Sequence, residues 1–168
     1  MKKIFFLIIP FILISCASKK DDNEFEKIIF HTSKCFGTCP EYHLELNQKR
    51  EIKLYIEKIY NKRTLDTLKT GYYRGKLDDE TYSELISLIE KIDIKKSGII
   101  EPIREQNTIT LKEGSQLSLT LYVKNQRKPM IYIYPEGHWK KLLSFVYKVS
   151  NLEYLTKTSE KLQIEPFH

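Results

Sequence analysis

The stretch EYHLELNQKREIKLYIEK, residues 41–58, decides the fold. In its first part Tyr42, Leu44 and Leu46 alternate with polar residues, which is the period-two pattern of a strand with one buried face. Residues 47–50 are polar and predict a turn, after which the alternation resumes through residues 52–57. We therefore predict two antiparallel strands with one apolar and one polar face.

Two later segments change to a helical period. Asp78 and Asp79 favour a helix start, and a stripe of apolar residues follows at helical spacing, namely Tyr82, Leu85, Ile86, Ile89 and Ile92. A second helix is expected to begin within residues 135–138 and to turn inward Trp139, Leu142, Leu143, Val146 and Val149.

Further strands are expected on both sides of the first helix. They are a strand around residues 28–32, a shorter one at 71–77, and three more at 107–112, 117–124 and 130–134, with turns at 113–115 and 125–128. The polar residues 61–70 predict a loop or an irregular hairpin end. The order strands, helix, strands, helix predicts an α+β fold, a mainly antiparallel sheet with two helices packed on one face. Residues 25–168 are expected to form a single globular domain.

The N-terminus indicates export. Lys2 and Lys3 precede an apolar run of 11 residues, which is shorter than the roughly 20 residues that a membrane-spanning helix needs. The end of this run, Leu-Ile-Ser-Cys at residues 13–16, resembles the lipobox of bacterial lipoproteins. That resemblance implies a signal peptide at residues 1–15, lipidation of Cys16, including a fatty-acyl group such as palmitate, and a flexible tether at 16–24.

The predicted location is therefore the bacterial cell envelope, with the membrane itself as a partner through the lipid anchor. Ala17 after the cysteine resembles the pattern sent to the outer membrane, and the cluster at residues 20–22 resembles tags for the cell surface. An outer-membrane lipoprotein can face the periplasm or the outside, and the sequence leaves both open.

The charged-residue composition limits the classes of partner that we expect this protein to bind. The 168 residues carry 28 Lys and Arg against 22 Asp and Glu, for a net charge of +6. Because basic residues alternate with acidic ones and the chain is exported, we expect no nucleic-acid binding. Anionic lipid headgroups, a cell-wall polymer or an envelope protein are the expected partners.

A small cysteine loop lies between the first two strands. Cys35 and Cys39 flank Gly37 in a chain expected to reach an oxidising compartment, so we predict a disulfide between them. His31, Cys35, Cys39 and His43 also form a set that is chemically sufficient for zinc, which is the alternative hypothesis. The spacing does not place all four on one helix face, since Gly37 and Pro40 argue against a helix here.

The same segment carries a resemblance. The residues Cys-Phe-Gly-Thr-Cys-Pro-Glu-Tyr at 35–42 resemble the signature C-F-G-x-C-P-x-Y of the bacterial envelope family catalogued as domain of unknown function 6438. The resemblance extends over about residues 28–152 and implies an exported, mostly lipid-anchored domain without an established activity. One departure is the turn at 48–50, where Gln-Lys-Arg stands in place of the expected glycine-containing turn.

No catalytic pattern accompanies these features. The sequence lacks the glycine-flanked serine, HExxH, phosphate-loop and dinucleotide motifs. We expect a protein that is not an enzyme and needs no cofactor, and an uncharacterised envelope hydrolase is a further alternative.

The polar face of the sheet is the predicted site. By alternation it displays Tyr55, Tyr122, Tyr132 and Tyr134, and tyrosine provides a large contact area at low entropic cost. The leading hypothesis is a non-enzymatic, lipid-anchored module that binds a partner through this face.

Overall fold

The computed structural model describes residues 25–33, 37–92, 116–132, 137–151 and 155–166 of the chain. Its main sheet has seven antiparallel strands in the order β8-β7-β1-β2-β3-β6-β9. Their bounds are β1 Phe25–Thr32, β2 Glu41–Asn47, β3 Glu51–Lys58, β6 Gly71–Lys76, β7 Leu117–Val123, β8 Gln126–Tyr132 and β9 Leu155–Thr158. The predicted hairpin is confirmed as β2 and β3, in which Leu44 pairs with Leu54.

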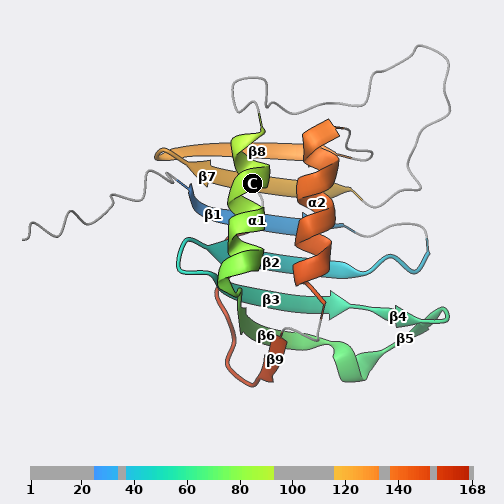
Figure 1. Ribbon diagram of the computed structural model, residues 1–168. Coiled ribbons are helices and arrows are strands. Elements are labelled where there is room, and N and C mark those ends of the chain that lie inside the picture. Colours follow the sequence, from blue (N-terminus) through green and yellow to red (C-terminus); the bar gives the residue numbers. More distant parts are fainter. Residues whose placement is uncertain (1–24, 34–36, 93–115, 133–136, 152–154, 167–168) are drawn as a thin grey trace, which may run out of the picture.

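Two helices, α1 Asp79–Glu90 and α2 Gly137–Val149, lie side by side across one face of the sheet (Figure 1). The predicted α+β fold is therefore confirmed. Helix α1 begins as expected, because the Asp78 side chain accepts a hydrogen bond of 2.7 Å from the Thr81 backbone N–H. Among the residues described, neither helix is long and apolar enough to cross a membrane.

The main core fills the space between the sheet and the helices. Alternate residues of the central strands are buried there, including Ile28, Phe30, Leu44, Leu46, Ile52, Leu54, Leu119 and Leu121. The helices contribute Leu85, Ile89, Leu142 and Val146, which are among the positions that helical spacing predicted. The opposite face of the sheet, which we call the open face, carries the intervening residues.

The position that we predicted for one turn is wrong. We expected it at residues 125–128, whereas β8 already begins at Gln126 and the turn is made by Lys124 and Asn125 alone. Both residues have φ of 57°, the left-handed conformation that a two-residue hairpin turn requires. The sequence signal was weak because glycine, the usual residue in such a turn, is absent.

Smaller elements complete the described chain. The predicted loop at 61–70 contains a short hairpin, β4 Tyr60–Asn61 with β5 Thr64–Leu65, and a 3-10 helix, η1 Thr67–Lys69. Strand β9 was not predicted, since its four residues are too few to show a period. The predicted strand at 107–112 lies outside the described residues.

Candidate functional site

A row of four rings crosses the open face. The antiparallel registers pair His31 with His43, His43 with Tyr55, and Tyr55 with Tyr72, on strands β1, β2, β3 and β6. Ring centroids along this row are 5.0, 5.7 and 4.5 Å apart, and the last two pairs are stacked. We call these four side chains the aromatic row. The expectation that Tyr55 faces away from the helices is thereby confirmed.

The two histidines of the row are hydrogen-bonded to each other. His31 Nε2 lies 3.0 Å from the backbone oxygen of Glu165, which can only accept, so His31 carries its proton on Nε2. His31 Nδ1 is then the acceptor in the 2.8 Å contact with His43 Nδ1, and His43 is the donor. On the other side of the ring, His43 Nε2 lies 3.5 Å from Glu57 Oε2.

Burial sets the charge state of His31. The residue is only 7% exposed, and burial together with the neighbouring charge of His43 lowers the pKa of His31 from 6.5 to about 4. The bond to the Glu165 carbonyl acts in the opposite direction but is outweighed. His31 is therefore neutral at pH 7, as the assigned hydrogen bonds require.

An irregular C-terminal segment covers part of the open face. We call residues 161–166 the strap; it follows β9 and forms no helix or strand. Leu162 of the strap is buried although it does not belong to the main core, and so is Ile29, the neighbour of Glu45 and Thr120 on the open face. The centre of the open face is therefore covered by the chain's own C-terminal segment.

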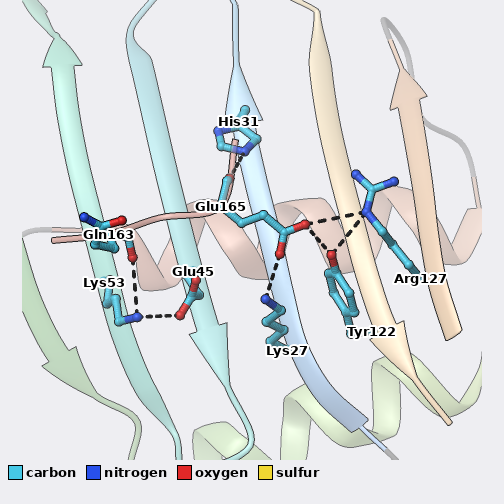
Figure 2. A network of polar contacts seen from close by, with 8 residues as sticks. All are labelled: Lys27, His31, Glu45, Lys53, Tyr122, Arg127, Gln163 and Glu165. Carbon is cyan, nitrogen blue, oxygen red and sulfur yellow. Dashed lines mark hydrogen bonds and ion pairs between the residues drawn. The ribbon is translucent and has the colours of Figure 1, made fainter. Parts of the chain in front are cut away.

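Charged contacts hold the strap in place (Figure 2). The carboxylate of Glu165 accepts hydrogen bonds from Lys27 Nζ, at 2.7 Å, and from the Tyr122 hydroxyl. Arg127 Nε lies 3.6 Å from Oε1 of the same carboxylate. Burial opposes ionisation of Glu165, but the hydrogen bonds from Lys27 and Tyr122 outweigh it and lower its pKa. Lys53 forms an ion pair with Glu45 and also donates to the Gln163 carbonyl at 3.5 Å.

A cavity of about 580 Å³ lies where the strap meets the aromatic row. Its volume is within the range of roughly 300–1,000 Å³ that is usual for ligand sites. The sheet contributes His31, Thr32, Ser33, His43, Tyr55, Tyr72, Gln116 and Ser118, and the strap contributes Lys161, Leu162, Gln163, Ile164 and Pro166. Hydroxyl, amide and imidazole groups line the sheet side, and both apolar and polar side chains line the strap side, which suits a ligand of mixed polarity.

The remaining tyrosines behave differently. Tyr122 is on the open face as predicted, since it pairs with Lys27 and Arg127, but it binds the strap instead of facing solvent. Position 132 pairs with Leu117 and has the parity of Met130, a core residue. The register therefore places position 132 on the helix-covered face, which corrects our prediction. The two-residue turn sets this register. Tyr134 lies outside the described residues.

The cysteine loop lies between β1 and β2 in the sequence, and Thr32 and Ser33, which precede it, line the cavity. Thr32 braces the base of the loop, because the Thr32 hydroxyl donates to the Pro40 carbonyl at 2.7 Å and accepts from the Tyr42 N–H at 2.9 Å. Cys35 lies outside the described residues, as do Cys16 and the other residues before Phe25, so lipidation and the disulfide stay predictions. Within the described ranges no group of three or more metal-ligating side chains occurs.

Sequence reasoning missed the strap and with it the cavity. Residues 155–166 show neither helical nor strand periodicity, and nothing in the pattern distinguishes Glu165 from any other surface carboxylate. The only available signal was Ile29, an apolar residue at a polar-face position, which indicates that something covers that face.

The fold and site together define an α+β domain with one sheet face closed by helices and the other partly closed by its own C-terminal segment. The family model described as domain of unknown function (DUF6438) matches residues 26–152. The chain belongs to this family, and the resemblance inferred from the cysteine loop is confirmed. The match ends before β9 and the strap. Comparisons with curated proteins and with solved structures found no match.

Proposed function

We propose that this protein is a lipid-anchored bacterial envelope protein, sited at the outer membrane, whose domain binds a partner and does not catalyse a reaction. The observation that carries the proposal is the cavity between the aromatic row and the strap. Its walls offer stacked rings, hydroxyls and an amide, which are groups that recognise a ligand by contact and hydrogen bonding. The partner is an envelope protein or a cell-wall polymer.

The lipid anchor is the part of the proposal that concerns location. Acyl chains on Cys16 bring the domain to the membrane surface, because each buried CH₂ contributes about 0.8 kcal/mol. Metabolic labelling with a fatty-acid probe is expected to mark the wild-type chain and to leave the Cys16→Ser variant unmarked. An unmarked wild-type chain would contradict the anchor.

Crosslinking in intact cells tests the binding site. A photo-reactive amino acid at Tyr55 is expected to give a covalent adduct, because Tyr55 lines the cavity. The same amino acid at Ser83, which is exposed on α1 on the opposite side of the sheet, is the control. Adducts from Ser83 alone, or from neither position, would contradict the proposed site.

A metal-handling function is the second candidate, and one contact favours it. The Nδ1 atoms of His31 and His43 face each other at 2.8 Å. Two nitrogens on one tetrahedral zinc ion lie about 3.3 Å apart, so a small rotation of the rings would admit the metal. Cys35 and Cys39 would supply the other ligands only as thiolates.

Two measurements on protein purified without reductant separate the candidates. A stoichiometric metal by elemental analysis supports metal binding. A mass two hydrogens below the reduced value supports the disulfide of Cys35 with Cys39 and excludes the thiolates.

A further inference from the structure

The strap is bound by contacts that any extended peptide could make. His31 Nε2 donates to the Glu165 carbonyl at 3.0 Å, and Lys53 Nζ donates to the Gln163 carbonyl at 3.5 Å. These carbonyls are two residues apart and belong to the backbone, so they carry no side-chain information. The open face therefore binds the backbone of an extended chain, and these contacts do not depend on the sequence of that chain (Figure 2).

Two strap side chains add selectivity. The carboxylate of Glu165 is bound by groups from three neighbouring strands, Lys27 on β1, Tyr122 on β7 and Arg127 on β8. Leu162 is 6% exposed and lies outside the main core, so it is an apolar anchor on the same face. The face thus recognises an apolar residue followed three positions later by an acidic one.

The strap does not fill the groove in which it lies. A cavity of about 580 Å³ remains beside it, and the aromatic row lines this space. A segment with larger side chains would bury more apolar area against His43, Tyr55 and Tyr72 than the strap does. A segment with larger apolar side chains therefore fits this groove better than the strap does.

We propose that the open face is a groove for an extended acidic segment of a partner protein, and that the strap is its intramolecular competitor. This inference rests on the proposed function and names its ligand class. The incoming segment takes the positions of Leu162 and Glu165. Because the strap is tethered to β9, its effective concentration is on the order of millimolar, so the partner binds weakly until the strap is displaced.

The test uses the full chain in detergent and two labelled peptides. One peptide has the sequence of residues 160–166, EKLQIEP, and the other has Gln in place of the second Glu. The Glu165→Gln variant weakens the competitor, so we expect it to bind the acidic peptide at least tenfold more tightly than the wild-type chain does. The Gln peptide is expected to bind this variant at least tenfold less tightly than the acidic one.

Glu160 provides the matched control. Its carboxylate pairs with Arg74 at 2.7 Å, away from the Lys27 and Arg127 contacts, so Glu160→Gln changes the charge equally without loosening Glu165. We expect this variant to bind the acidic peptide as the wild-type chain does. If both variants gained affinity for the acidic peptide equally, the inference would be overturned, because the change in net charge alone would then explain the gain.

A second substitution locates the peptide. Lys27→Met in the Glu165→Gln background is expected to abolish binding of the acidic peptide, and Arg127→Gln repeats the test if the first variant does not fold. Equal binding of the two peptides, or no binding by Glu165→Gln, would overturn the inference. A glycan crosslinked at Tyr55 without peptide binding would also overturn it and leave the proposed function standing.

Discussion

The two faces of the sheet are covered in different ways. On the helix-covered face, residues such as Leu44, Leu54 and Leu119 are fully or almost fully buried in one continuous apolar core. On the open face, the cover is a strap held by hydrogen bonds and ion pairs to Lys27, Tyr122 and Lys53, with a cavity left beside it. One face is packed to exclude water, and the other retains polar groups and space.

This difference separates stability from binding. Apolar burial under the helices supplies the main folding free energy. The strap contributes less to it, because apart from the buried Leu162 its contacts are polar and partly exposed. Substitutions on one face should therefore unfold the protein, whereas those on the other should change what it binds.

Neighbouring residues of β3 give the largest expected contrast. Leu54 is completely buried in the core, whereas Tyr55 points to the open face and stacks between His43 and Tyr72. Leu54→Ala is expected to lower the free energy of unfolding by about 3 kcal/mol. Tyr55→Ala is expected to lower it by about 1 kcal/mol. Urea denaturation measures both changes in the free energy of unfolding. A larger decrease for Tyr55→Ala than for Leu54→Ala would contradict the proposed difference between the two faces.

The pH dependence of the free energy of unfolding reports on the protonation of His31. Its pKa is 6.5 in the reference state and about 4 in the folded protein, so the unfolded chain binds more protons between these values. This contribution to the free energy of unfolding is complete above pH 6.5 and is lost as the pH falls towards 4. The pKa difference corresponds to at most roughly 3 kcal/mol.

Denaturation curves between pH 4 and 7 measure this effect. The His31→Gln variant is expected to show a weaker pH dependence across that window than the wild-type protein. Identical slopes in the two proteins would show that His31 is not buried in its neutral form.

Much of the helix-covered face was predictable, since period-two and helical patterns mark the residues that it buries. Residues 42–46 and 52–56 show this for the strands. Strand parity allows His31 and His43 to share the open face, and the register of β1 and β2 then makes them direct neighbours. Position 132 was misplaced because its register depends on a turn that lacks glycine. The strap was missed because a segment held by polar contacts shows no periodic pattern of apolar residues.

Loosening the strap should affect local order more than global stability. Glu165→Gln removes the charge that Lys27 and Arg127 bind, which is expected to cost about 1.5 kcal/mol locally. Hydrogen exchange of the strap amides should accelerate about tenfold, while the amides of β2 keep their protection. Equal acceleration in β2 would show that the strap belongs to the main cooperative unit.

The smallest expected effect concerns the turn between β2 and β3. Arg50 has φ of 69°, which is unfavourable for a residue with a side chain, and the family pattern led us to expect a glycine in this turn. Its ion pair with Asp79 is exposed and contributes little. Arg50→Gly is therefore expected to raise the free energy of unfolding by about 0.5 kcal/mol, measured by urea denaturation. A decrease would show that the Asp79 contact outweighs the backbone strain.

Hydroxyl-radical footprinting of tyrosines tests most directly whether the open face is the binding surface. The protein in intact cells is compared with the purified protein, and modification is read at Tyr55 and Tyr72 in the cavity and at Tyr147, which is 39% exposed on α2. We expect Tyr55 and Tyr72 to be protected in cells and Tyr147 to be modified equally in both samples. Protection of Tyr147 with unchanged Tyr55 and Tyr72 would contradict the account.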